Sequence, residues 1–437
     1  MNLVVDPEIV KTIIELYDRK NIAAGNTRII RKIADKIEEQ SGIKFIRMEI
    51  GEPGIIPSHI GLQSVVEALE KNSSFYPPPD GIPTLKNEIS RFVKLFLDKE
   101  IPADYCIPTV GSINGCYASL MVAGRRLDNK DTVLFIDPGF AAQKHLVQML
   151  GIKQDCFDVY DYRGQKLYEK LTEKLEKGNI AVILYSNPNN PAWICFTEEE
   201  LEIIGSLATK YNAVVIEDLA YFAMDFRKDY SHPGLPPYQP TVARYTDNYI
   251  LLISSSKSFS YAGQRIGMMV VSDKLFRSCF PSLKRYYASD IFGTALVYGT
   301  LLLTTGGVAQ SVQAGFAEIL RNVNDGYFNF VEEVRQYGKK AEIMKRIFIE
   351  NGFSIVYDRD GSDPIGDGFY FTVSFPGFQG DELSERLLYY GISSIPLSST
   401  GSYRTEGIRA CVSLVHFDQM PELDRRLKLF ANRMNEI

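Results

Sequence analysis

Three polar side chains stand directly after apolar runs in the middle of the chain. Asn190 lies in NPNNP after the run AVILYS, and Asp218 ends the run VVIED, three residues before Tyr221. Lys257 follows the run YILLIS, in ISSSKSFSYAGQRIG. A lysine amine can act as a nucleophile or a proton carrier, and an acid nearby can hold a cation. Taken alone, each has an ordinary explanation: a turn residue, a loop cap and a solvated surface charge.

The apolar runs predict the framework that positions these residues. Branched apolar segments at 131–137, 179–187, 212–220, 248–256 and 265–271 alternate with helical patterns, as in FTEEELEIIGSLATKY at 196–211. Near-continuous apolar runs are typical of strands buried on both faces, so we expect a mainly parallel sheet covered by helices on both sides. Ligands of such sheets bind beyond the carboxyl ends of the strands. The three polar groups should therefore meet on one rim.

The last third of the sequence predicts a second, smaller part of the fold. Residues 316–352 have a helical pattern, and 353–361, 368–376 and 407–415 resemble strands. A terminal helix should start after Pro421, and the N-terminal helix, which has no sheet of its own, should pack on this part. We expect an N-terminal arm and part of the small domain at 1–58, a large cofactor-binding domain at 59–315 and a C-terminal small domain at 316–437.

Composition excludes several classes of protein. The 437 residues carry a net charge of −6, with no basic run that would indicate a nucleic-acid surface. The longest apolar runs are too short to span a membrane, and the N-terminus lacks the features of a signal peptide. The six cysteines and four histidines are widely spaced, which predicts reduced thiols and no metal site. We expect a cytoplasmic protein without nucleic-acid or membrane partners.

Together, these segments resemble pyridoxal-phosphate enzymes of the aspartate aminotransferase superfamily, the class I/II aminotransferases of fold type I. The family patterns N-P-x-N-P and D-x-A-Y stand at 187–191 and 218–221. The lysine signature S-x-S-K with G-x-R-x-G is carried by Ser254, Ser256, Lys257, Gly263, Arg265 and Gly267. The resemblance runs from near residue 50 to near residue 409. It implies a large α/β domain with a mainly parallel seven-stranded sheet flanked by helices, plus a smaller α+β domain formed by the N- and C-terminal segments.

The resemblance assigns the central chemistry to four residues. Lys257 would form a Schiff base with pyridoxal 5'-phosphate and then move a proton between the substrate α-carbon and the cofactor. Asp218 would keep the ring nitrogen protonated by favouring its charged form. Asn190 and Tyr221 would hydrogen-bond the oxygen on the ring, and Asn190 would also contact the substrate.

The resemblance also implies which residues bind the phosphate and the substrate. The phosphate would rest on the backbone of Gly111, Ser112 and Ile113 at a helix N-terminus, completed by Ser254, Ser256 and Arg265. Phe140 would stack on the ring. Arg409 and the backbone of Gly51 would bind the substrate carboxylate. Tyr76 would reach the phosphate of the neighbouring subunit, which implies a homodimer with shared active sites.

The sequence departs from the family pattern on the substrate side. Ala192 and Trp193 follow the asparagine motif where Thr-Gly is usual, and Leu397 stands where glycine is common. Trp193 could narrow the substrate pocket or pack under the loop. The leading function is an aminotransferase acting on an L-amino acid and a 2-oxo acid. The alternatives are a C–S β-lyase or an amino-acid decarboxylase on the same fold, a non-catalytic regulator, and a module that binds another phosphate ligand.

Overall fold

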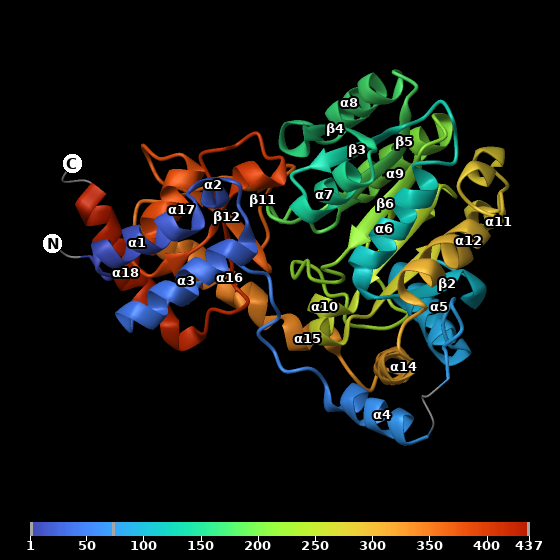
Figure 1. Cartoon of the computed structure of the whole chain (residues 1–437), viewed down its shortest axis with the longest axis horizontal. Coiled ribbons are helices and arrows are strands. Elements are labelled where there is room, and N and C mark those ends of the chain that lie inside the picture. Colours follow the sequence, from blue (N-terminus) through green and yellow to red (C-terminus); the bar gives the residue numbers. More distant parts are fainter. Residues whose placement is uncertain (1–2, 72–74, 435–437) are drawn as a thin grey trace.

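The computed structural model describes residues 3–71 and 75–434, arranged as two parts joined side by side. A large sheet with its helices is built from the middle of the chain, and both ends of the chain form the smaller part (Figure 1). In the described residues no helix is both long and apolar enough to cross a bilayer. None of the six cysteines forms a disulfide.

The large part contains a seven-stranded mixed sheet, as predicted. Its order is β2-β8-β7-β6-β5-β3-β4, and β8 runs antiparallel to its two neighbours. The strands are β2 (Cys106–Thr109), β3 (Thr132–Asp137), β4 (Lys153–Asp158), β5 (Ile180–Ser186), β6 (Val214–Leu219), β7 (Tyr249–Ser254) and β8 (Gly267–Val271). Strand β4 was not expected, because its sequence KQDCFD is mostly polar and it lies at the edge of the sheet.

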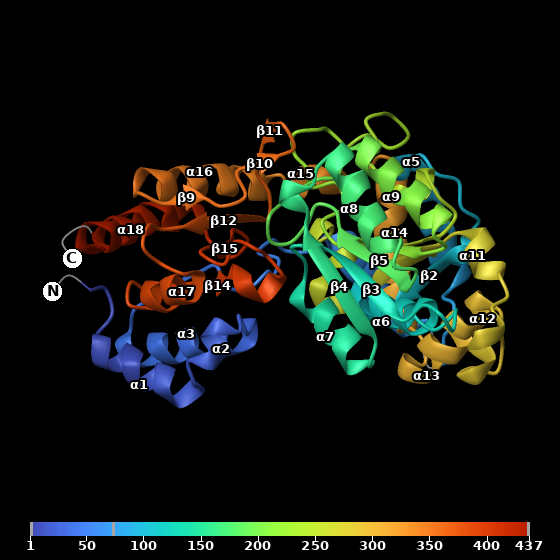
Figure 2. The same cartoon turned by 90° about the horizontal axis from the view of Figure 1, so that it is seen from above.

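Helices cover both faces of this sheet, with α8 and α9 on one face and α6 and α7 on the other (Figure 2). Along β3, for example, Leu134 and Ile136 join one hydrophobic core while Val133 and Phe135 join the other. A capping box between Thr197 and Glu200 starts α9, within the predicted helical pattern at 196–211. The helices of this part include α5 (Pro83–Leu97), α6 (Gly111–Ala123), α7 (Ala141–Met149), α8 (Gln165–Leu175), α9 (Glu198–Lys210), α10 (Ser255–Ser258), α11 (Asp273–Arg277), α12 (Phe292–Leu296) and α13 (Leu302–Thr305).

The smaller part joins the two ends of the chain. A parallel pair links β1 (Ile46–Arg47) to β13 (Ile392–Ser393), so the N-terminal segment does pack on the C-terminal one. An antiparallel sheet has the order β14-β15-β12-β9, from β14 (Ile395–Pro396), β15 (Ile408–Cys411), β12 (Tyr370–Ser374) and β9 (Ser354–Ile355). Its helices are α1 (Pro7–Tyr17), α2 (Lys20–Ala23), α3 (Thr27–Ser41), α16 (Gln336–Glu350), α17 (Gly380–Leu388) and α18 (Met420–Met434). Helix α18 begins one residue before Pro421, not after it, because proline is tolerated in a first helical turn.

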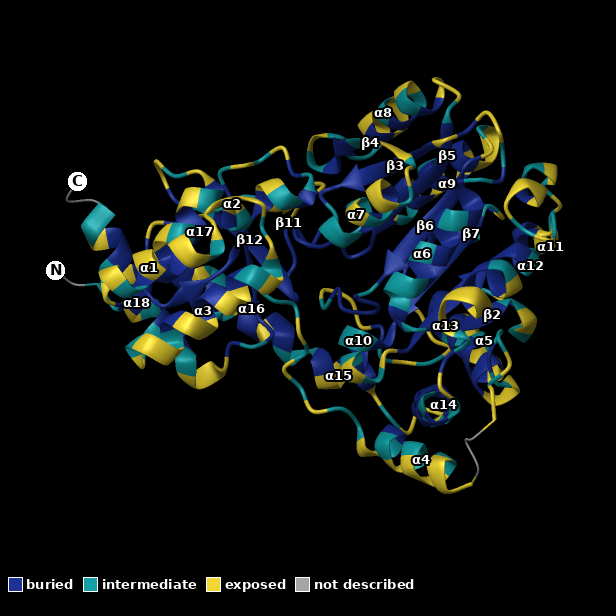
Figure 3. Cartoon of the chain, in the orientation of Figure 1, coloured by how far each residue is buried: buried dark blue, intermediate teal, exposed yellow. Residues whose placement is uncertain are grey.

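The two parts are connected by helices that pack together below the sheet. Helix α4 (His59–Glu70) lies against α14 (Gln310–Asn324), and α15 (Phe330–Val334) leads into α16. The predicted boundary at residue 315 falls inside α14, and the division into domains stays a prediction. The buried surface is continuous through the strands of the large sheet and the seam between the two parts, whereas the outer faces of α4, α8 and α11 are exposed (Figure 3).

Candidate active site between the two parts

The structure brings the predicted site residues to one edge of the large sheet, facing the small one. Asn190 follows β5, Asp218 lies in β6 and Lys257 lies in α10 just after β7. Arg409 comes from β15 on the opposite side, and its Nη1 donates to Asn190 Oδ1 at 3.2 Å. Parallel strands deliver their carboxyl ends to the same rim, which is why residues so distant in the sequence meet here.

Lys257 lies half-buried, and its ammonium donates to the backbone carbonyl of Gly51. The ring of Phe369 lies 5.7 Å from the Lys257 Nζ. Burial lowers the pKa of Lys257 to about 8, and the positive charge of Arg409 also lowers it. A larger fraction of this amine is therefore neutral near physiological pH than for a surface lysine, and only the neutral amine is a nucleophile or a base.

Asp218 is buried, and one of its two carboxylate oxygens has no protein partner. Gln143 Nε2 donates to Asp218 Oδ2 at 2.7 Å, while Oδ1 is enclosed and unpaired. Burial raises the pKa of Asp218 to about 7, against the hydrogen bonds from Gln143 and the backbone of Ala220. A buried unpaired oxygen costs free energy unless a ligand pairs with it. Sequence reasoning missed Gln143, because a glutamine three residues into a helix is not by itself a signal.

The start of α6 presents backbone N–H groups of the kind that bind anions at a helix N-terminus. This helix begins at Gly111, so the backbone N–H groups of Gly111, Ser112 and Ile113 are in its first turn. Gly111 has a φ of +71°, and a Cβ there would lie 2.5 Å from Arg265 Nη2. The glycine thus lets the guanidinium approach the helix end. Ser254 caps α10, where its hydroxyl accepts from the Ser256 N–H at 3.1 Å.

Arg409 is buried, 5% exposed, and is held in place from several sides. Its Nη2 donates to the backbone carbonyl of Glu49 at 2.6 Å, and its Nε is buried with no partner. The guanidinium lies over the ring of Tyr370, 4.5 Å from the centroid. Its two hydrogen-bond acceptors in the described part of the chain are an amide oxygen and a backbone carbonyl, neither of them a carboxylate, so its charge is available for an anionic ligand.

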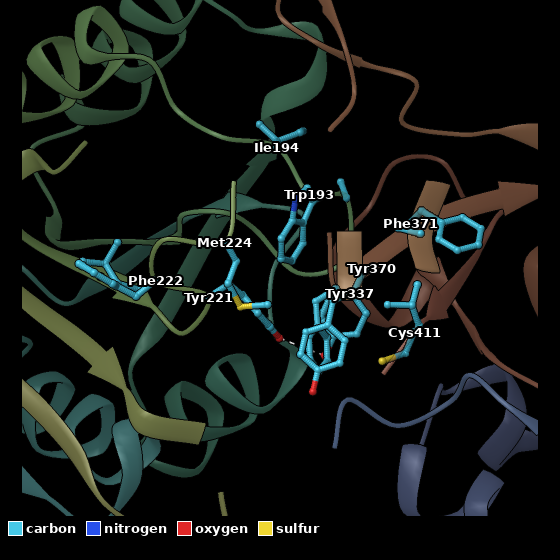
Figure 4. Packing of buried hydrophobic residues seen from close by; sticks show 14 of the residues in the cluster. Trp193, Ile194, Tyr221, Phe222, Met224, Tyr337, Tyr370, Phe371 and Cys411 are labelled. Atoms are coloured by element: carbon cyan, nitrogen blue, oxygen red, sulfur yellow. Dashed lines mark hydrogen bonds between the residues drawn. The ribbon is translucent and has the colours of Figure 1, made fainter. Parts of the chain in front are cut away.

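Tyr370 belongs to the site although no sequence motif indicated it. The Tyr221 hydroxyl donates to the Tyr370 hydroxyl at 3.0 Å, as drawn in Figure 4. A Cβ on Gly51 would lie 1.9 Å from the Tyr370 oxygen, so only glycine fits at that position. Tyr370 therefore fills the space between Tyr221, Gly51 and Arg409.

Two of the predicted site residues have exposed side chains. Phe140 is 43% exposed and precedes α7, one turn before Gln143. Tyr76 is 94% exposed, close to the segment 72–74 that lies outside the described residues. The roles of both stay predictions.

The two departures from the family pattern are buried packing residues. Trp193 is fully buried in the seam between the two parts, with its ring 5.3 Å from that of Tyr221 (Figure 4). A Cβ on Gly368 would lie only 1.8 Å from the indole, so the tryptophan packs flat on that glycine. Of the two expectations for Trp193, the structure supports packing. Leu397 is buried as well, against Gly407.

A carboxylate from the small part holds the loop that carries Asn190 and Trp193. Asp360, in the hairpin of β10 (Arg359–Asp360) and β11 (Asp363–Pro364), accepts from Arg163 Nη1 at 2.7 Å and from Arg227 Nη2 at 2.6 Å. Asp360 Oδ2 also accepts from the backbone N–H of Cys195 at 3.2 Å. This buried charge cluster ties the small part to the loop after β5.

Comparisons with known proteins show the family and the fold of the chain. The sequence model of the family "Aminotransferase class I and II" matches residues 44–337, more than half of the chain. A probable aspartate aminotransferase of Methanocaldococcus jannaschii is 27% identical over 328 residues, covering 70% of this chain and 82% of the relative. An aspartate aminotransferase of Pyrococcus horikoshii is 26% identical, covering 85% and 87%. The crystal structure of an aspartate aminotransferase from Thermotoga maritima shares the fold with a TM-score of 0.74 at 19% identity, covering 93% of this chain and 96% of that one.

Proposed function

The chain belongs to the class I and II aminotransferases, and from that premise we propose how its own residues hold pyridoxal 5'-phosphate and an amino-acid substrate. The predicted family, fold class and aminotransferase function are confirmed. The lyase and decarboxylase alternatives are not favoured, because the similar proteins are named as aminotransferases. The family implies the cofactor, and the arrangement of buried polar atoms supports it.

The observation that carries the proposal is the unpaired Oδ1 of Asp218. When bound, pyridoxal 5'-phosphate supplies a positively charged ring nitrogen and an electron sink for the carbanion of the substrate. A buried carboxylate with one oxygen held by Gln143 and the other free recovers much of its lost hydration energy when it pairs with such a cation. That pairing would lower the pKa of Asp218 again and keep the ring nitrogen charged.

The remaining contacts fit the other ends of the same cofactor. The first turn of α6 and the guanidinium of Arg265 offer a phosphate both N–H donors and a positive charge. Ser254 and Ser256 lie at the start of α10 on the same rim. Asn190 and Tyr221 are the donors we assign to the ring oxygen, and Phe140 is the residue that we assign to the face of the ring.

Lys257 has the properties required for its two tasks. Its lowered pKa would provide the neutral amine that an aldehyde cofactor requires, and its hydrogen bond to the Gly51 carbonyl fixes where Nζ points. Lys257 Nζ would also take a proton from the substrate α-carbon and donate one back, as general base and general acid. Arg409 orients that α-carbon by pairing with the substrate carboxylate.

We further propose a homodimer with shared active sites. Tyr76 is almost fully exposed, and large apolar side chains at nearby positions in the sequence are exposed as well, at Ile56, Val66, Leu69 and Phe75. A surface of this kind is costly in water, and a second copy of the chain would cover it. Tyr76 would then reach the phosphate held by the neighbouring subunit.

The test is the absorption of the purified protein with and without added pyridoxal 5'-phosphate, followed by half-reactions with single L-amino acids. Because the similar proteins are named for aspartate, aspartate with 2-oxoglutarate is the first pair to assay. A visible band should form and be lost on adding a donor amino acid, without release of pyruvate and ammonia. Lys257→Ala should lose both the band and the turnover, whereas Lys274→Ala, at an exposed lysine, should keep them. A protein that stays colourless would refute the proposal.

A further inference from the structure

Tyr370 lies between two proposed ligand-binding groups, and we infer that it is a positioning residue that orients Tyr221 and Arg409 together. The inference rests on the proposed function, since it concerns how the cofactor oxygen and the substrate carboxylate are held. Tyr370 itself comes from the small part of the fold, whereas Tyr221 comes from the large part. A single side chain therefore connects the two binding regions across the seam.

The ring of Tyr370 supports Arg409 because of the register of the small sheet. Arg409 pairs with Thr372 in the antiparallel ladder, so Tyr370, two residues earlier on β12, is its diagonal neighbour on the same face. This places the guanidinium 4.5 Å from the ring centroid. In a buried site such a cation–π contact is worth more than at the surface, and it fixes the plane of the guanidinium.

The hydroxyl of Tyr370 acts on Tyr221. Both tyrosines are at most 4% exposed, so water does not compete for their hydrogen bond of 3.0 Å. A tyrosine hydroxyl has one proton but can also accept. When Tyr221 donates to the oxygen of the cofactor ring, its own oxygen remains free to accept, and the Tyr370 hydroxyl is the donor in reach. Tyr370 then strengthens the donation by Tyr221, because hydrogen bonds in a chain polarise one another.

The surroundings prevent Tyr370 from turning away. The rings of Phe369 and Trp193 lie 5.1 and 6.4 Å from its ring, and Gly51 closes the space at its hydroxyl. Arg409, Cys411 and Tyr221 are the charged or titratable groups that act on Tyr370. Its position is thus fixed by packing, as a positioning residue requires.

Two substitutions separate the roles of the hydroxyl and the ring. Tyr370→Phe keeps the ring under Arg409 but removes the hydrogen bond to Tyr221. The weaker donation leaves more negative charge on the ring oxygen, which holds the proton at Lys257 Nζ more tightly. The midpoint, which is the pH at which the absorbance of the visible band is half-changed in a titration, should rise by about 0.5 pH unit relative to the wild type. The Kd for maleate, an unreactive dicarboxylate, should stay within about twofold of the wild-type value. Tyr370→Leu removes both contacts, so it should raise the midpoint and also weaken maleate binding about threefold.

The readouts distinguish this role from a structural one. Tyr390→Phe, which removes the hydroxyl of another buried tyrosine, one that packs on Phe430, should change neither the midpoint nor the Kd. A Tyr370→Phe midpoint equal to that of the wild type, or a lower Tm as its sole effect, would overturn the inference, as would an unchanged maleate Kd in Tyr370→Leu. Failure of the proposed function looks different: the wild-type protein itself would form no visible band. Maleate binding to the cofactor-free protein, measured by calorimetry, then still decides whether Tyr370 supports Arg409.

Discussion

The cofactor-free protein should become more stable when Asp218 is replaced by asparagine, and increasingly so as the pH rises. Burial raises the pKa of Asp218 from 3.8 to about 7, so the folded protein favours the neutral carboxyl while the unfolded chain ionises above about pH 4. Below pH 4 the carboxyl is neutral in both states and costs nothing. As the pH rises through the folded pKa, the cost to folding grows to about 4 kcal/mol.

Asp218→Asn isolates this cost, because the amide has nearly the shape of the carboxyl but does not titrate. The advantage of the variant in unfolding free energy should grow by about 2.5 kcal/mol between pH 5 and pH 7.5. Urea unfolding of both cofactor-free proteins at the two pH values measures it. Glu217 and Asp137 also have raised pKa values, but both are present in the two proteins and cancel in the difference.

An advantage of Asp218→Asn that stays constant or shrinks between pH 5 and pH 7.5 would refute this reasoning. A matched control is Asp131→Asn, because a hydrogen bond from Lys153 lowers the pKa of Asp131 and the sign is opposite. Here the variant should lose stability relative to the wild type as the pH rises. Saturating pyridoxal 5'-phosphate should reverse the order for Asp218, since only the carboxylate pairs with a ring cation. The free-energy cost of the buried carboxylate in the cofactor-free protein is thus offset when the carboxylate pairs with the bound cofactor.

Two further predictions concern the seam between the two parts. Asp360→Asn removes the charge shared by two arginines, so the unfolding free energy measured by urea titration should fall by about 3 kcal/mol. The control Asp363→Asn, at an exposed residue of the same hairpin, should change the unfolding free energy by less than about 0.5 kcal/mol. Equal effects of the two substitutions would contradict the role assigned to Asp360. Gly368→Ala places a methyl group against Trp193, and this overpacking should cost about 1–3 kcal/mol and lower the Tm by several degrees. The control Gly263→Ala, where a Cβ meets open space, should leave the Tm unchanged. Similar Tm values for the two variants would contradict the packing of Trp193 on Gly368.

Much of the sheet and of the rim could be predicted from the sequence, because buried parallel strands leave long apolar runs and because strand ends share one edge. Asp218 and Lys257 were found in this way. Strand β4 was not, since an edge strand needs no apolar run on both faces. Gln143 and Tyr370 were also missed, because their significance depends on which residues face them across α7 and β12, and no local pattern records such contacts.

The single tryptophan gives this protein a built-in optical probe. Trp193 is the only indole among the 437 residues, it is fully buried, and it lies beside Tyr221 at the seam. Its emission therefore reports one known location without labelling. Energy transfer to a chromophore bound near Tyr221 would quench it, and separation of the two parts would expose it to water and shift its emission to the red. The intensity of the tryptophan emission can follow cofactor binding, and its wavelength can follow the separation of the two parts of the fold.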